Sequence, residues 1–343
     1  MIGRLALLIA LAGVWITAAP LGGVPARATF PGENGKIAFT HGTADGQPEI
    51  YVMDSDGSNM ENVTNNSAAD IAAAWSPDGE RIAFSSDRGG SLDVYVMDAD
   101  GENVTRLTDE PALDCCAAWS PDGSKIAFHS DRDGDLDVYV MDAGGANVVN
   151  LSDNPAFDGY PDWSPDGSLI AFSTDRNDGH EDIYLMNADG SDQRELAGEP
   201  DSETSPVWSP DGTKIVYARS FGDQYEVYIM NADGTDVINL TRTNISDGNA
   251  VWAPDGTRLL FDTSQASGET SSDLATMLPD GSDVTMLTEG EASEYNGDWQ
   301  PRIEGAAEGG GSGGGLAGWW IAAGAAAVVA ALAGFVVLRL WRS

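Results

Sequence analysis

An acidic residue stands five positions before each of six tryptophans in this chain. Carboxylates that recur at one place in a repeat can do one of two things. They can accept hydrogen bonds from backbone N–H groups of their own loops, or they can form a negative funnel for a cation or a basic peptide. We treat them as candidate ligand-binding residues of an acidic ring. The six are Asp70, Asp114, Asp158, Glu203, Asp247 and Glu294.

A second charged motif, Asp-Arg, occurs in three segments that resemble one another. It could capture a ligand, but a guanidinium beside a carboxylate also forms strong charge-assisted hydrogen bonds. We therefore expect salt bridges, placed between neighbouring structural repeats. The three motifs are Asp87-Arg88, Asp131-Arg132 and Asp175-Arg176.

The chain offers few residues for metal binding or acid–base chemistry. Its three histidines, His41, His129 and His180, are far apart in sequence, and its two cysteines, Cys115 and Cys116, are adjacent. Adjacent Cα atoms lie about 3.8 Å apart, which is too close for a relaxed disulfide. Two small buried thiols are therefore favoured over a vicinal disulfide. The sequence predicts no catalytic residue, no metal site and no cofactor.

The charge balance limits the class of partner. The 343 residues include 55 acidic and 17 basic side chains, which gives a formal net charge of −38. Such a chain repels nucleic acid and anionic membrane surfaces, so neither is expected as a main partner. A protein or peptide, most readily a basic one, is the expected partner, and a divalent cation is a further candidate.

The tryptophans mark a repeat that explains how these residues are positioned. The motif Trp-Ser/Ala-Pro-Asp-Gly begins at Trp75, Trp119, Trp163, Trp208 and Trp252, with spacings of 44, 44, 45 and 44 residues. A period near 44 is typical of propeller blades. Each repeat holds four short β-rich runs separated by Pro, Asp and Gly turn signals. The pattern predicts a four-stranded antiparallel blade in each repeat.

The two ends of the repeat region complete each other. The first repeat begins at Lys36 without a tryptophan run, and the segment 295–300, which contains Trp299, has no repeat after it. If 295–300 pairs with 36–40, six complete blades result. The expected fold is therefore an all-β, six-bladed propeller over 34–301, whose closure removes exposed sheet edges.

The repeat WSPDGxxIAFxSDRxGxxDVYVMDADGxNxxxLT resembles the TolB-type, WD-like propeller repeat, over about residues 34–301. The resemblance implies a secreted or periplasmic six-bladed propeller that binds proteins. Two features differ from that family's pattern. The residues between 28 and 36 leave no room for the small α/β domain that precedes the TolB propeller, and an apolar span follows at the C-terminal end.

In such a blade the tryptophan run is the innermost strand, next to the central channel. The six acidic residues precede this strand in every blade, so they are expected around one mouth of the channel. Variable loops on a rigid ring are common binding sites.

The ends of the chain predict where the propeller resides. Residues 1–28 have the layout of a signal peptide. A glycine-rich linker, 302–316, leads to 317–338, an uncharged segment long enough to span a bilayer as a helix. The tail 339–343 contains arginines and is expected in the cytoplasm. These features predict a single-pass membrane protein with an extracytoplasmic propeller; a sorting signal, cut during attachment to the cell surface, is the alternative.

Two classes of function fit this organisation. The first is a non-catalytic, membrane-tethered scaffold that binds a protein or ligand at the cell surface. The alternative is an accessory or substrate-gating propeller that works with a separately encoded hydrolase of the prolyl oligopeptidase type. The chain itself is predicted not to be an enzyme, because the Gly-x-Ser-x-Gly match at 310–314 lies in a glycine run without the strand and helix of a nucleophile elbow.

Overall fold

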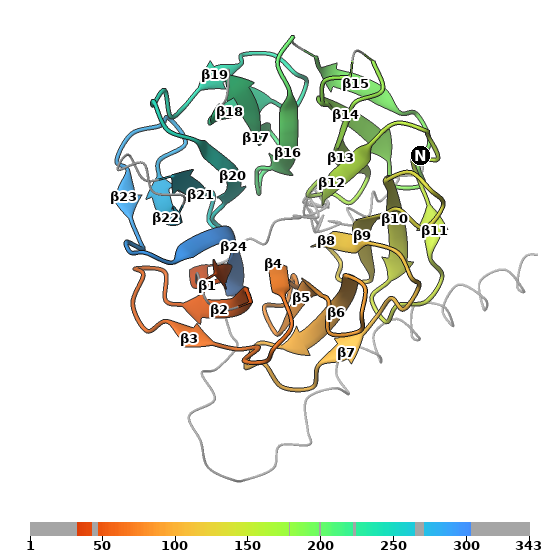
Figure 1. Cartoon of the computed structure of the whole chain (residues 1–343). Coiled ribbons are helices and arrows are strands. Elements are labelled where there is room, and N and C mark those ends of the chain that lie inside the picture. The colour runs from red at the N-terminus through yellow and green to blue at the C-terminus, as the bar shows by residue number, and fades with distance from the viewer. Residues whose placement is uncertain are drawn as a thin grey trace, which may run out of the picture. The chain divides into compact units, whose positions relative to one another are not determined.

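The computed structural model describes residues 33–42, 47–177, 179–198, 200–221, 224–264 and 271–302. Six four-stranded antiparallel sheets surround a central axis (Figure 1). The six-bladed, all-β propeller predicted from the repeat is thereby confirmed. The predicted signal peptide and C-terminal span lie outside the described residues. Within the described ranges, no helix is long and apolar enough to cross a membrane.

Each blade contributes one strand at each of four distances from the axis, in the order of the sheet topology. The inner strands are β4 (Asp70–Trp75), β8 (Asp114–Trp119), β12 (Asp158–Trp163), β16 (Glu203–Trp208), β20 (Asp247–Trp252) and β24 (Ser293–Arg302). The second strands are β1 (Glu33–Gly42), β5 (Arg81–Ser86), β9 (Lys125–Ser130), β13 (Leu169–Thr174), β17 (Lys214–Phe221) and β21 (Leu259–Ser264). The third strands are β2 (Glu49–Met53), β6 (Asp93–Asp98), β10 (Asp137–Asp142), β14 (Asp182–Asn187), β18 (Gln224–Asn231) and β22 (Ser272–Met277). The outer strands are β3 (Glu61–Asn62), β7 (Thr105–Arg106), β11 (Val149–Asn150), β15 (Arg194–Ala197), β19 (Ile238–Asn239) and β23 (Thr285–Met286).

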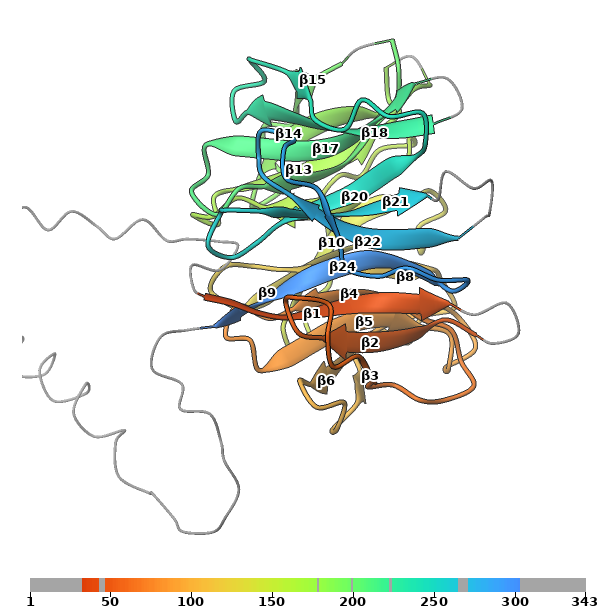
Figure 2. The same ribbon diagram turned by 90° about the vertical axis from the view of Figure 1, so that its left-hand side faces the viewer.

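The first blade is built from both ends of the propeller. Strand β24 pairs antiparallel with β1, and Trp299 lies opposite Ile37. Figure 2 shows the two strands side by side. This confirms the predicted closure, with pairing that extends from Glu33 opposite Arg302 to Gly42 opposite Ser293. Blade 1 therefore comprises β24 and β1–β3, and blades 2 to 6 follow in chain order, four strands each.

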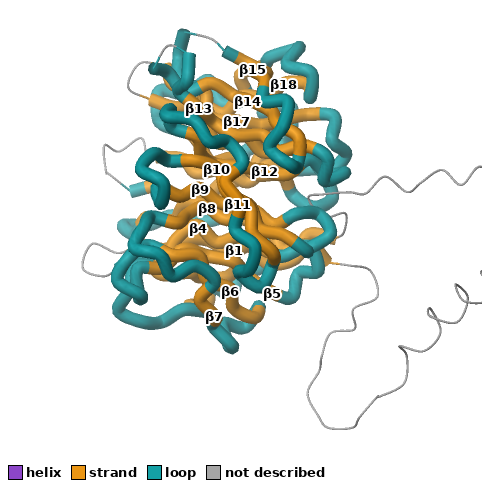
Figure 3. Tube along the Cα trace, turned by 90° about the vertical axis from the view of Figure 1, so that its right-hand side faces the viewer, coloured by secondary structure: helices purple, strands orange, loops and turns teal. Residues whose placement is uncertain are grey.

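Tight turns join the strands as the turn chemistry predicts. In the turn at Ser120, Gly123 has φ +68° and its N–H donates to the Ser120 carbonyl at 2.8 Å. The Asp122 carboxylate accepts the Ser124 N–H at 3.0 Å, which fixes the turn. Figure 3 shows such loops on both faces of the ring, with the strands between them.

The hydrophobic core lies between adjacent blades. In one cluster, Ile50 and Val52 of β2 pack with Trp75, Phe84 and Met97 of blade 2. Each tryptophan run thus contributes a large apolar side chain to a blade–blade contact. The ring depends on these contacts, because a single blade cannot bury both of its faces.

The outer hairpins add a second contact between blades. Gly145, in the turn after β10, has φ +84°, and a Cβ there would lie 2.7 Å from the Leu107 carbonyl oxygen of blade 2. The same close approach to the preceding blade occurs at the equivalent glycines Gly57, Gly101, Gly190, Gly234 and Gly281. The Asp-Gly pairs of the repeat, and the Gly-Gly pair of blade 3, therefore set both a turn and an inter-blade distance.

Substitutions at two neighbouring glycines test whether the outer hairpin packs closely against the preceding blade. Gly145→Ala should lower the free energy of unfolding by about 2 kcal/mol or more, because an L residue is strained at that φ and its methyl group meets backbone. Gly144→Ala is the matched control, since a Cβ there meets nothing within 4 Å. Urea unfolding of both variants measures the difference; equal stability would contradict the proposed packing role of the hairpin.

Candidate functional site

The six acidic residues of the predicted ring all begin or adjoin an inner strand, and all are buried. Their exposed fractions are between 0% and 4%. The channel cavity, of about 210 Å³, is lined by residues of all six inner strands, and none of the six acids is among the described residues that line it. All six are therefore buried and do not line this cavity.

Three of these acids are paired with the arginines of the Asp-Arg motif. The Nη2 to Oδ1 distances are 2.9 Å for Arg88 and Asp70, 2.8 Å for Arg132 and Asp114, and 2.7 Å for Arg176 and Asp158. Each pair lies within one blade. The expectation of salt bridges between blades was therefore wrong.

The sheet register explains this correction. The second strand runs antiparallel to the inner strand, so its end lies beside the start of the inner strand of the same blade, as Ser130 opposite Asp114 shows. Arg132, two residues after Ser130, lies over the rings of Phe128 and Tyr139, 5.3 and 4.9 Å from their centroids. Acid, arginine and aromatic rings form one unit inside the blade.

The remaining three acids have other partners. Glu203 Oε1 lies 3.8 Å from Arg219 Nη1, Glu294 Oε1 lies 2.8 Å from His41 Nδ1, and Thr243 Oγ1 donates to Asp247 Oδ2 at 2.7 Å. Burial raises the pKa of Asp158, of Asp247 and of Glu294. The ligand-binding role of the acidic ring stays a prediction, while the contacts show that these carboxylates hold their own blades together.

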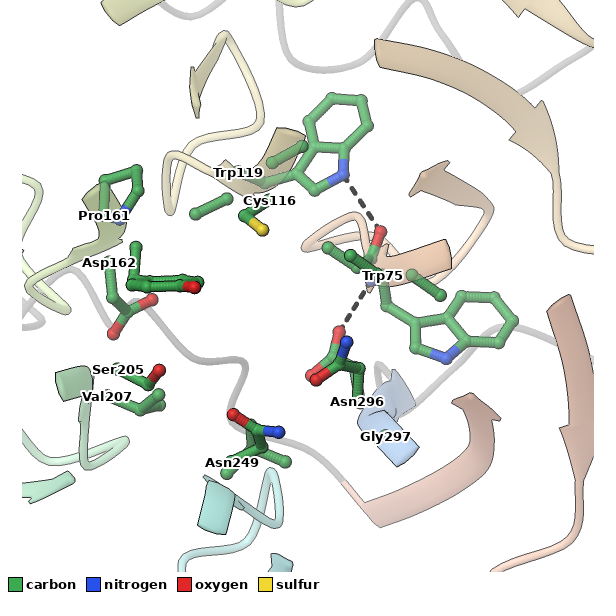
Figure 4. Close-up of a pocket in the computed structure, with 18 of the residues that line it drawn as sticks. Trp75, Cys116, Trp119, Pro161, Asp162, Ser205, Val207, Asn249, Asn296 and Gly297 are labelled. Atoms are coloured by element: carbon green, nitrogen blue, oxygen red, sulfur yellow. Dashed lines mark hydrogen bonds between the residues drawn. The ribbon is translucent and has the colours of Figure 1, made fainter. Parts of the chain in front are cut away.

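Each inner strand carries a β-bulge two residues after its acidic residue, which sequence reasoning missed. The bulged residues have φ between +45° and +60° although none is glycine. They are Ala72, Cys116, Tyr160, Ser205, Asn249 and Asn296. All six line the channel, because the bulge turns each of them toward the axis. Figure 4 labels four of them, Cys116, Ser205, Asn249 and Asn296.

Most of these bulges are held by the preceding blade. In five of the six junctions, a side chain of the second strand accepts the N–H of the bulged residue in the next blade. The pairs are Thr40 with Ala72 (3.2 Å), Ser85 with Cys116 (3.3 Å), His129 with Tyr160 (3.3 Å), Ser173 with Ser205 (3.0 Å) and Asp262 with Asn296 (3.1 Å). At the sixth junction the equivalent residue is Ala218, which has no side-chain acceptor.

Two carboxylates do line the channel. Asp162 in blade 4 and Asp298 in blade 1 stand three blades apart in a ring of six, so they lie across the channel from one another. Asp162 Oδ2 accepts the Trp208 N–H at 2.8 Å and Asp298 Oδ2 accepts the Trp75 N–H at 2.7 Å, the latter dashed in Figure 4. Enclosure by protein raises the pKa of both to about 7.

A signal for this pair was present in the sequence. Asp162 and Asp298 directly precede Trp163 and Trp299, where the other repeats have Ala or Val. Comparing the repeats position by position would have found them. The acids five residues before tryptophan occur in all repeats, which makes them easy to find in the sequence. Residues that all repeats share support the common fold.

The two cysteines also lie in this region. Cys115 and Cys116 are unlinked thiols whose Sγ atoms lie 2.8 Å apart. The structure therefore agrees with two free thiols, of which Cys115 is buried and Cys116 faces the channel. The contact between them lowers the pKa of Cys115 and raises that of Cys116.

The channel carboxyls predict a pH dependence of stability. Since the pKa of Asp162 and of Asp298 is raised to about 7 in the fold, the folded chain binds protons between about pH 4 and pH 7 that the unfolded chain does not. Stability should fall as pH rises through this range. The double change Asp162→Asn, Asp298→Asn should reduce the fall by on the order of 1 kcal/mol per carboxyl.

Urea unfolding at pH 5 and pH 8 measures this change. Asp135→Asn, at an exposed position, controls for the loss of a negative charge. A wild-type protein that is more stable at pH 8 than at pH 5, or a double variant with the same slope as wild type, would contradict the prediction.

Comparison with known proteins agrees with this geometry. The family described as TolB beta propeller domain matches residues 19–114, 90–156 and 110–301. A 55-residue segment is 44% identical to the Tol-Pal system protein TolB of Desulfosudis oleivorans (strain DSM 6200 / JCM 39069 / Hxd3), and it covers 16% of this chain and 12% of that relative.

Solved structures share the fold. The crystal structure of TolB from Acinetobacter baumannii is similar with a TM-score of 0.71 and 24% identity, over 80% of this chain and 68% of that one. An oligogalacturonate lyase in complex with manganese is similar with a TM-score of 0.53 and 17% identity, over 73% of each chain. The repeats, the six closed blades and the family match together show that this chain belongs to the TolB β-propeller domain family.

Proposed function

We propose that this chain is a non-catalytic, extracytoplasmic propeller, tethered to the membrane, that binds a protein through a basic segment or a chain end placed in the channel. The observation that carries the proposal is the pair Asp162 and Asp298, two carboxylates on opposite walls of one narrow cavity. The TolB family match supports a protein partner, and the sequence of the two chain ends supports the location and the tether.

The channel has the composition of a binding site. Its lining includes tryptophan, proline, alanine and valine side chains together with a few polar groups, which is typical of ligand pockets. Tyr160, Ser205 and Asn249 line both the channel cavity and a second cavity of about 410 Å³. A ligand could thus contact both cavities without a change in the ring.

Charge decides which ligand is favoured. The net charge of −38 attracts a basic partner over a distance, and Asp162 and Asp298 then bind an ammonium or guanidinium group at close range. A cavity of about 210 Å³ is suited to a side chain or a chain end. A divalent cation is the second ligand that two opposed carboxylates would accept.

The proposal is tested with a defined peptide, hexa-arginine, titrated by calorimetry into the full chain in about 0.15 M salt, where exposed charges are screened. The double change Asp162→Asn, Asp298→Asn should weaken binding by about tenfold or more. Binding should also be tighter at pH 8 than at pH 6, since both carboxyls have a pKa of about 7.

A triple variant of the acidic ring is the comparison for the channel double variant. The triple change Asp70→Asn, Asp158→Asn, Asp247→Asn should lower stability with little effect on peptide binding, because these residues hold their own blades together. If the triple change abolished binding and the double change did not, the acidic ring would be the site and the channel proposal would be wrong.

A further inference from the structure

Blade 3 brings three metal-ligating side chains together at the wall of the channel. Both Sγ atoms of Cys115 and Cys116 and one ring nitrogen of His129 lie within 4.8 Å of one another. Side chains of successive strand residues normally point to opposite faces. Here the bulge at Cys116, with φ +60°, removes that alternation and places the two sulfurs 2.8 Å apart.

The histidine is fixed on the neighbouring strand. His129 is the cross-strand partner of Cys115, and its side chain is 5% exposed. Its Nδ1 accepts the Tyr160 N–H at 3.3 Å, and the Tyr160 ring packs edge-on with the centroids 5.3 Å apart. Nδ1 is therefore the unprotonated nitrogen of the neutral ring, and a metal ion bound there takes the place of the Tyr160 N–H on the same lone pair.

The repeat itself does not require these residues. The positions of Cys115, Cys116 and His129 are occupied by Ile71, Ala72 and Ser85 in blade 2. In blade 5 they are occupied by Thr204, Ser205 and Ala218. Both blades form the same bulge and the same strand pairing without a thiol or an imidazole. The fold therefore does not require cysteine or histidine at these three positions, and the three side chains are available for another role.

We propose that Cys115, Cys116 and His129 bind one thiophilic monovalent cation of the Cu(I) class. Two thiolates with an imidazole are a soft ligand set, and soft ligands select Cu(I) over hard cations. A structural zinc site takes four protein ligands, whereas three ligand-type side chains meet here among the described residues. The site is reached through Cys116, which lines the channel.

Binding of the cation changes the distance between the two sulfurs and their protonation. Metal–sulfur bonds of about 2.3 Å separate two sulfurs by roughly 4.0 Å at the trigonal angle of a three-ligand site, so the Sγ pair opens when the cation enters. Each sulfur that binds as a thiolate gives up its proton to solvent, and no electron is transferred. Binding should therefore be weaker at lower pH.

The test is anaerobic competition between the reduced full chain and a coloured Cu(I) chelator such as bicinchoninate. The wild-type chain should withdraw one Cu(I) per molecule. Cys115→Thr and Cys116→Ser copy blade 5, and His129→Ser copies blade 2, whose serine keeps an acceptor for the bulge N–H of the next blade. Each cysteine change should weaken binding at least about 100-fold, because even outer-shell partners of a metal are worth 10- to 100-fold.

Controls separate this site from other binding. His180→Ala, at an exposed histidine, and the channel double change Asp162→Asn, Asp298→Asn should leave the one-to-one binding unchanged. If either change weakened binding as much as the cysteine variants do, the proposal would fail. The result is also independent of the peptide experiment, so either proposal can fail alone.

A measurement on the wild-type chain covers the case in which a variant does not fold. Bound Cu(I) should protect Cys116 from alkylation by N-ethylmaleimide, read by peptide mass spectrometry. Absence of protection, stoichiometric binding of Zn²⁺ in place of Cu(I), or a Cys115–Cys116 disulfide that persists in reductant would each overturn the proposal.

Discussion

The structure depends on the bulge that each inner strand carries two residues after its acidic residue. A non-glycine residue with φ near +55° is strained, and its N–H points away from its own sheet. At five junctions that N–H is satisfied by a side chain of the preceding blade, from Thr40 to Asp262. A blade therefore completes its inner strand only beside its neighbour, and closure through β24 and β1 supplies the last neighbour. The strained backbone at the bulges and the assembly of the ring therefore depend on each other.

The same bulge gives the channel its chemistry. It turns one side chain per blade toward the axis, and these side chains differ from blade to blade while the backbone repeats. In blades 2, 3 and 4, acid–arginine pairs such as Asp114 with Arg132 join the start of the inner strand to the end of the second strand. The bulged residues that vary, together with Asp162 and Asp298 directly before two of the tryptophans, then give the symmetric ring an asymmetric interior. The differences between repeats therefore supply the asymmetry that the proposed binding requires.

The periodic features of the fold were predictable from the sequence, and the contacts across strands were not. Tryptophan spacing and the Pro-Asp-Gly turns predict six blades, and the unmatched run at Trp299 predicts closure. The strand register sets the contacts across strands. It pairs Arg132 with Asp114 inside a blade and places His129 opposite Cys115. A bulge shifts that register by one residue, and here the bulged residue is never glycine, so no composition signal marks it.

The most direct test adds a side-chain acceptor for the Asn249 N–H, at the junction where Ala218 provides none. Ala218 stands at the junction before the bulge of Asn249, and Ala218→Ser would place a hydroxyl where Ser173 accepts the Ser205 N–H in the preceding junction. The account predicts that Ala218→Ser raises the free energy of unfolding by about 1 kcal/mol and that Ser173→Ala lowers it by a similar amount. Unfolding in urea measures both. A destabilised Ala218→Ser variant together with an unaffected Ser173→Ala variant would contradict it.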